Sequence, residues 1–344
     1  MNNLVTIRLL VNRISQIILG ACFLHTCAFG ADAPIAPTVD QMLSYMGIDP
    51  NQRKALMSGE IIYKEIGDAS DKELAVGLVM FVKASPDKLA DYVTPEKMFK
   101  RDTDTTASGE LTGAPADKLN GMKFSADEAQ SLLNAEPGSD LNLSTDEIKQ
   151  FNAARKQVTD DSQIPTVAAR TYSNILLGRL RAYLKGGLNA IAPYDRDGNV
   201  TSPAKQLTIA LNASKIVSQH FPMMFNALLN FPNDQPQGIV NRFFWSEQNI
   251  EKHPTLILSH RSSYMLPDAI LMADRQFYVG RTYNCMQRLA GCFPVQGGSI
   301  VFYANRTNTD QVAGFMSGMK HGIGRGQMRD EITKTFQQVR AAIQ

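Results

Sequence analysis

The spacing of apolar residues predicts strands near the start of the chain. Residues 60–66 form a short strand-like run, and residues 74–82 are apolar on both faces. A strand of the second kind is typical of a sheet that is covered on both sides. Ser85-Pro86-Asp87 then starts a short helix, with serine as its cap and proline at its first position. This part of the pattern therefore predicts two strands followed by a helix.

The middle of the chain changes to a helical period. Capping-box spacings begin at Ser125 and at Ser144, where a glutamate follows each serine three residues later. A longer helix follows Pro165, because its apolar positions recur every three or four residues. Further helices are predicted at about 203–219 and 222–230. The middle of the chain is therefore expected to be helical.

The last third returns to strands and ends in a long helix. The strands are predicted at 240–245, 255–264, 269–281 and 299–306. Short turns between consecutive strands favour an antiparallel meander, and an apolar stripe from Val312 to Ile343 predicts the helix. The predicted fold class is α+β, with a curved antiparallel sheet packed on the long C-terminal helix and a helical insertion.

The first thirty residues have the pattern of an export signal. Two arginines precede the apolar run 17–24, and Ala28 and Gly30 are the small residues of a cleavage site. We therefore expect a periplasmic or secreted protein with a signal peptide cleaved near Gly30. One alternative is a lipoprotein acylated at Cys22, and another is a buried N-terminal helix.

Three segments make up the predicted organisation of the chain. Residues 1–30 are the signal peptide, and residues 31–58 are a leader with short helices. Residues 59–344 form one domain, which contains the helical insertion at about 125–231. No internal repeat or low-complexity segment interrupts this order.

Composition limits the partners more than it identifies them. The chain has 344 residues with 35 basic and 33 acidic side chains, so its formal charge is +2. Loss of residues 1–30 removes two arginines and leaves 314 residues with 33 charges of each sign. A balanced charge gives no strong attraction to nucleic acid or to an anionic membrane. We therefore expect no nucleic-acid partner.

Cys285 and Cys292 would be the cysteines of the mature chain. An oxidising compartment favours a disulfide between them. That bond needs a non-helical loop, because a helix would hold cysteines seven residues apart at about 10 Å. Gly291 and Pro294 permit such a loop. Metal binding by these two thiols is the less favoured alternative, since no histidine or further cysteine lies close in sequence.

Three parts of the chain resemble the START-like, helix-grip (SRPBCC) superfamily. The first runs from Glu60-Ile61-Ile62-Tyr63 through the apolar strand to Ala84-Ser85-Pro86-Asp87. The second is the strand pair at 275–278 and 302–306, and the third is the long C-terminal helix. The resemblance covers about residues 60–100 and 240–344. The chain also resembles uncharacterised exported bacterial proteins that carry the same helical middle.

This resemblance implies a cavity between the sheet and the C-terminal helix. Members of the superfamily usually bind lipids, sterols, polyketides or other hydrophobic molecules there. We therefore expect an exported binding or carrier protein for a hydrophobic small molecule or lipid. One alternative is a cavity enzyme of the same superfamily that acts on a hydrophobic substrate. The other is an envelope interaction protein without a ligand. Transient contact with a membrane or an envelope protein is a further expected interaction.

Polar residues in the predicted strands are the candidate ligand contacts. Apolar pockets with a few fixed polar groups are the usual form of a small-molecule site. On that basis the predicted ligand-binding residues are His260, Tyr264, Gln276, Tyr278 and Tyr303. The alternative is that these residues belong to one solvated face of an antiparallel sheet, which needs polar side chains in any case.

Neither a catalytic group nor a cofactor is predicted from the motifs. Ser262 and Ser263 lack the Gly-x-Ser-x-Gly elbow of many hydrolases, and the histidines show no metal-binding spacing. We therefore assign no catalytic residue, no metal ligand and no cofactor. Glycines spaced by four, from Gly314 to Gly326, predict a ridge of the last helix that packs closely on a neighbour, with a flexible gate as the alternative.

Overall fold

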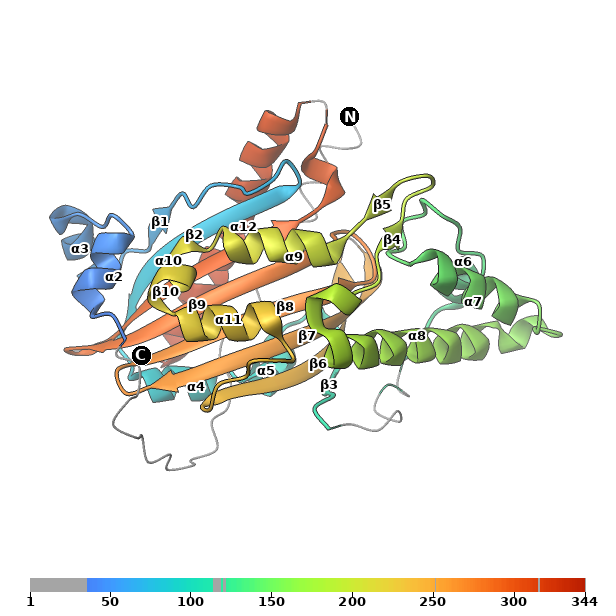
Figure 1. Ribbon diagram of the computed structural model, residues 1–344, viewed down its shortest axis with the longest axis horizontal. Helices are drawn as coiled ribbons and strands as arrows, with labels where there is room; N and C mark the ends of the chain where they lie inside the picture. The colour runs from blue at the N-terminus through green and yellow to red at the C-terminus, as the bar shows by residue number, and fades with distance from the viewer. Residues whose placement is uncertain (1–35, 114–118, 120–121, 251, 315, 344) are drawn as a thin grey trace.

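The structure is a computed structural model, which describes residues 36–113, 119, 122–250, 252–314 and 316–343. Its centre is an antiparallel sheet of eight strands in the order β1-β2-β10-β9-β8-β7-β6-β3 (Figure 1). The strands span β1 Ile62–Lys64, β2 Glu73–Val82, β3 Thr105–Glu110, β6 Ile239–Ile250, β7 His253–Leu266, β8 Ala269–Val279, β9 Cys285–Val295 and β10 Gly298–Asn308. A separate hairpin pairs β4 (Tyr194–Asp195) with β5 (Val200–Thr201).

The five strands β6 to β10 are consecutive antiparallel neighbours, so the predicted meander is confirmed for β6, β7, β8 and β10, whereas β9, which separates β8 from β10, was not predicted. β2 then pairs with β10 along its whole length. Each of the ten residues of β2 is buried, as the two-sided apolar pattern of this strand predicts. The chain is therefore α+β, with a large antiparallel sheet and a C-terminal helix.

Eleven α-helices surround the sheet in the described part of the chain. They span α2 Val39–Tyr45, α3 Pro50–Met57, α4 Pro86–Tyr92, α5 Pro95–Arg101, α6 Ala126–Leu133, α7 Thr145–Arg155, α8 Ile164–Gly186, α9 Pro203–Asn212, α10 Lys215–His220, α11 Pro222–Asn230 and α12 Ser317–Ile343. The predicted capping boxes begin α6 and α7, where Ser125 and Ser144 accept hydrogen bonds from the backbone three residues later.

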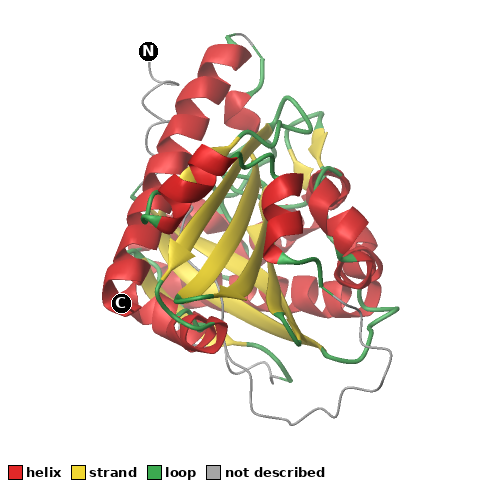
Figure 2. Cartoon of the chain, turned by 90° about the vertical axis from the view of Figure 1, so that its left-hand side faces the viewer, coloured by secondary structure: helices red, strands yellow, loops and turns green. Residues whose placement is uncertain are grey.

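Helices cover both faces of the sheet (Figure 2). We call the side reached by Leu78 of β2 the α12 face, because there Leu78 belongs to one apolar core with Ile332 and Phe336 of α12. The opposite side, reached by Phe302 and His260, is the α8 face. It carries α2, α8 and the short helices α9 to α11. The alternation of side chains along each strand assigns successive residues to opposite faces.

A sharp reversal at the end of α8 brings the helical segment back over the sheet. Gly187 ends the helix with φ of 56°, and a Cβ there would lie 1.7 Å from the carbonyl oxygen of Phe231. Only glycine fits this approach. Along α8, Arg179 forms a buried ion pair with Glu147 of α7, with 2.5 Å between Nη2 and Oε2. These contacts hold α7 and α8 at one end of the sheet.

The predicted disulfide is wrong. Residues 285–292, expected to form a loop, lie in the strand β9, which pairs with both β8 and β10. Cysteines seven residues apart on a strand are separated by about 23 Å, far beyond disulfide reach. Because seven is odd, they also point to opposite faces: Cys285 toward α9 and Cys292 into the core of the α12 face. Both thiols are free and buried.

The predicted signal peptide and the acylation of Cys22 fall on residues 1–30, which lie outside the described residues. In the part of the chain that the structure does describe, no helix is both long enough and apolar enough to cross a membrane. The predicted domain boundaries remain expectations from sequence.

Candidate ligand-binding site

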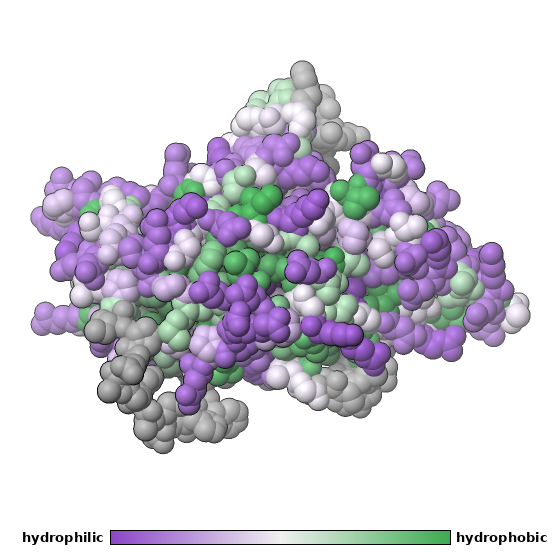
Figure 3. All heavy atoms as spheres, viewed as in Figure 1, coloured by the Kyte–Doolittle hydropathy of each residue, from purple (hydrophilic) through white to green (hydrophobic). Residues whose placement is uncertain are grey.

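A cavity of about 240 Å³ lies between the α8 face and the helices α2, α10 and α11. Hydrophobic residues gather near the middle of this face of the molecule, among hydrophilic ones (Figure 3). The cavity walls are mostly apolar and come from five separate stretches of sequence. The larger apolar side chains are Met42, Met46, Ile66, Ile216, Val217, Phe221, Met224, Leu271, Leu289, Phe293 and Phe302.

The sheet forms the floor of this cavity because small and large residues alternate across its strands. Phe302 of β10 lies opposite Gly291 of β9, and Ala304 lies opposite Leu289. The missing side chain of Gly291 makes room for the ring of Phe293, which would lie 2.8 Å from a Cβ at this position. Methionines from the helices close the other side, and their unbranched side chains adapt to irregular shapes.

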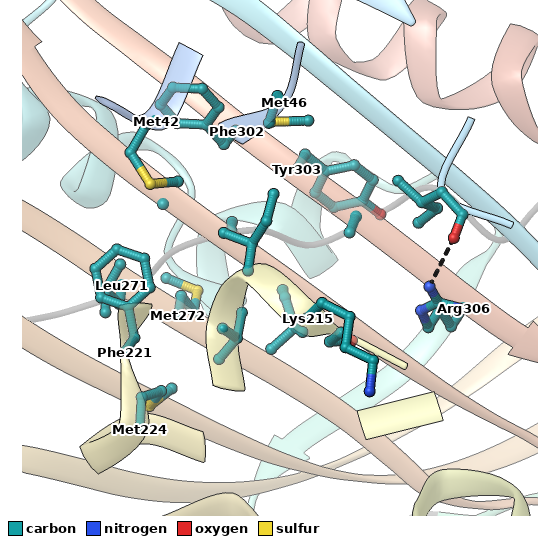
Figure 4. A pocket seen from close by; sticks show the side chains of 18 of the residues that line it. Met42, Met46, Lys215, Phe221, Met224, Leu271, Met272, Phe302, Tyr303 and Arg306 are labelled. Carbon is teal, nitrogen blue, oxygen red and sulfur yellow. Dashed lines mark hydrogen bonds between the residues drawn. The ribbon is translucent and has the colours of Figure 1, made fainter. Parts of the chain in front are cut away.

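The cavity has a polar border at one end. Ser214 and Lys215 come from the start of α10, and Arg306 comes from β10. Arg306 is buried; its Nη1 donates to Glu73 Oε2 at 2.6 Å and its Nη2 donates to the carbonyl oxygen of Ile66 at 3.1 Å (Figure 4). Burial raises the pKa of Glu73, although the adjacent Arg306 acts in the opposite direction. The guanidinium is thus fixed beside an apolar space.

Of the five predicted ligand-binding residues, Tyr303 borders this cavity. Its ring, however, packs edge-on against Phe336 of α12 at 5.2 Å, on the other face of the sheet. Gln276 also belongs to the α12 face, where its Oε1 accepts a hydrogen bond from Tyr283. Tyr264 lies on the α8 face, with its hydroxyl 3.6 Å from Met223 Sδ. The five residues therefore do not converge on one point.

His260 belongs to a buried hydrogen-bond chain on the α8 face. Arg275 Nη1 donates to the Tyr183 hydroxyl at 3.1 Å, and that hydroxyl lies 2.8 Å from His260 Nδ1. The other ring nitrogen, Nε2, lies 2.8 Å from Asn241 Oδ1, an acceptor. This pattern fits a neutral imidazole with its proton on Nε2. Burial, with a smaller contribution from Arg275, holds the pKa of His260 well below its usual value.

Tyr278 contacts α8 because of an irregularity in the sheet. The β7–β8 register shifts between Leu258 and Ser259, which allows Phe277 and Tyr278 to join the same core. The Tyr278 hydroxyl lies 2.7 Å from that of Tyr172, and burial raises the pKa of Tyr172 to about 12. These phenols are therefore neutral in the folded protein, and their contacts join α8 to the sheet.

A group of charged residues lies on the α12 face. The carboxylate of Asp274 is 3.3 Å from Arg288 Nη1 and 3.8 Å from Arg261 Nη2. The three residues sit side by side on β7, β8 and β9, and all are buried. Burial lowers the pKa of Arg261 to about 10, although the carboxylate of Asp274 opposes this shift. The ion pairs link three strands across the sheet.

Apart from Tyr303, the residues that line the cavity were missed by the sequence analysis. They come from α2 and its C-cap, from Ile66, from the segment 213–224 and from β8, β9 and β10. One signal was available in the sequence. Met42 and Met46 lie four residues apart, so they share one face of a helix. The polar strand residues that the sequence analysis predicted as ligand contacts mostly hold α8 and the strands together.

No protein-family model matches the chain, and no curated protein or solved structure gives a significant match. Among the residues that the structure describes, no group of three or more His, Cys, Asp or Glu side chains is placed to hold a metal ion.

Proposed function

We propose that this protein binds a hydrophobic small molecule or a lipid chain in the cavity beneath α2, α10 and α11, as a binding or carrier protein. The observation that carries this proposal is the apolar cavity itself. Its walls come from the sheet and from three short helices, and nearly all its larger side chains are apolar. Burying the surface of a ligand there would contribute about 25 cal/mol for each Å² of apolar area removed from water.

The volume supports a ligand of modest size. Pockets for drug-sized ligands usually occupy roughly 300–1,000 Å³, and this cavity holds about 240 Å³. A single alkyl chain or a small ring compound is therefore the best match. Met42, Met46 and Met224, on the helical side of the wall, allow some change of shape around different ligands.

The helix-grip resemblance is compatible with this proposal but implies a different place for the ligand. The antiparallel sheet and the C-terminal helix support the resemblance. The space between them is occupied by packed side chains, including Leu74 and Leu78 of β2 against Ile332 of α12. We therefore place the ligand on the α8 face. Periplasmic or secreted location stays part of the proposal on the sequence of residues 1–30 alone.

A neutral ligand and a cavity-filling substitution test this function. Delipidated protein is titrated with decanol by calorimetry, and the protein as extracted is measured by native mass spectrometry for a bound lipid. Val217 lines the cavity on α10, so Val217→Trp should fill it and weaken decanol binding about tenfold or more. Val200, which is 68% exposed on β5, provides the matched control Val200→Trp.

The control should bind decanol as the unmodified protein does. Circular dichroism checks that both variants are folded. Absence of decanol binding to the unmodified protein, or equal binding by Val217→Trp, would overturn the proposal.

A further inference from the structure

The cavity has one apolar end and one basic end. In Figure 4, Met42, Phe221 and Met224 lie on one side, and Lys215 and Arg306 lie together on the other. No aspartate or glutamate is among the residues that line it. A ligand that fills such a cavity would meet apolar walls along most of its length and cations at one end.

Arg306 holds an unused hydrogen-bond donor at this end. Both of its terminal nitrogens are engaged: Nη1 donates to Glu73 and Gly67, and Nη2 donates to Ile66 and Ala213. Its Nε has no hydrogen-bond partner within the described residues, although the side chain is 97% buried. A buried donor without a partner is unfavourable. Because surrounding side chains enclose Nε, they must shift before an acceptor brought by a ligand reaches and stabilises it.

Lys215 adds a second cation at the rim. It is exposed at the start of α10, and the structure gives its ammonium no ion pair with any described carboxylate. Its flexible stem of four carbons allows the ammonium to follow a ligand head group. Arg306 is neutralised by Glu73, whereas Lys215 supplies a net positive charge.

We propose that the ligand is an anionic amphiphile of the fatty-acid type, whose chain lies among the methionines and phenylalanines and whose carboxylate meets Lys215 Nζ and Arg306 Nε. This inference rests on the proposed function and names the class of ligand. The chain length is bounded by the cavity, which matches one chain rather than a two-chain lipid.

A matched pair of probes separates the head group from the chain. Decanoate and decanol, both kept below the concentration at which they aggregate, are titrated into the full chain at pH 8 by calorimetry. Decanoate should bind about tenfold tighter than decanol, because a charge-assisted hydrogen bond to a buried donor is added. Equal affinities, or tighter binding of decanol, would overturn the proposal.

Lysine substitutions then test the cation at the rim. Lys215→Met should weaken decanoate binding about threefold, as is typical of an exposed charge pair, and leave decanol binding unchanged. Lys205→Met is the control, because Lys205 is exposed on the neighbouring helix α9 and does not line the cavity. The proposal fails if Lys215→Met and Lys205→Met have the same effect on decanoate.

A charge-rescue variant tests Arg306 without removing it. Glu73→Gln leaves the guanidinium without its carboxylate, so decanoate should raise the melting temperature of this variant more than that of the unmodified protein. An equal or smaller rise would count against a carboxylate at Arg306. If decanol binds but decanoate has no advantage, the anionic head group is wrong and the hydrophobic function stands. If neither probe binds, both proposals fail.

Discussion

At the scale of single residues, polar groups in the interior mostly fasten elements to one another. His260 illustrates this, since its two ring nitrogens contact α8 through Tyr183 and β6 through Asn241. Its folded-state pKa lies well below the unfolded value, because burial disfavours the charged imidazole. The stability that depends on neutral His260 is therefore fully present above about pH 6.5 and is lost progressively as the pH falls below it.

The lowered pKa of His260 gives a prediction for the pH dependence of stability. Below pH 6.5 the unmodified protein should lose up to about 1.4 kcal/mol per pH unit more than His260→Gln, because glutamine takes up no proton. Urea unfolding at pH 7.5, 6.5 and 5.5 measures both slopes. His253→Gln, at an exposed histidine, should keep the slope of the unmodified protein. Equal slopes for His260→Gln and the unmodified protein would contradict the assignment.

The two cysteines give a second prediction at this scale. Burial raises the pKa of Cys292 to about 12 and that of Cys285 well above its usual value, so neither thiol ionises near neutral pH. Both should react slowly with a disulfide reagent in the folded protein and rapidly in urea. Peptide mapping after alkylation without reductant provides the check. A peptide pair linked through Cys285 and Cys292 would refute the assignment of residues 285–295 to β9.

At the scale of elements, α12 shows how a correct pattern can lead to the wrong contact. Gly318, Gly322 and Gly326 would each place a Cβ in open space within the described structure, and Gly314 lies before the helix. The predicted close-packing ridge is therefore wrong. Gly324, outside that ridge, makes the close approach instead: a Cβ there would lie 2.8 Å from Leu74 Cδ1 of β2.

The same substitution at two neighbouring glycines tests this contact. Gly324→Val should cost about 1–3 kcal/mol of unfolding free energy, because the larger side chain must displace Leu74 from a packed core. Gly322→Val, half a turn away with open space around it, should be nearly neutral. Urea unfolding measures both variants. Similar losses would mean that the cost comes from valine in a helix rather than from the contact with Leu74.

Sequence alone could predict the elements that obey a single period. β2 was predicted because its residues are apolar on both faces, and four strands of the meander because short turns join strand-like runs. α6 and α7 were predicted because each carries its own cap. β9 was missed because Cys285 and Cys292 favoured a disulfide loop, and nothing local shows that a strand lies on each side. The cavity was missed for a similar reason, since its walls meet only after five distant segments have packed.

At the scale of the whole molecule, the sheet has two covered faces, and the remaining question is which of them takes a ligand. The helix-grip resemblance implies the α12 face. The cavity lies on the α8 face, beneath helices of six to nine residues that are short enough to separate from the sheet locally. A ligand at about one hundred times its dissociation constant should stabilise the folded state by about 2.7 kcal/mol.

Hydrogen exchange with and without decanol distinguishes the two faces. Ligand on the α8 face should slow exchange in α2 and in the segment 213–230, because the ligand holds these helices against β9 and β10. The part of α12 from Met328 to Ile343 packs on the other face, so it should change little. The Val217→Trp variant should lose the protection along with the binding. Protection centred on α12, with none in α10 or α11, would place the ligand where the resemblance implies and would refute the site on the α8 face.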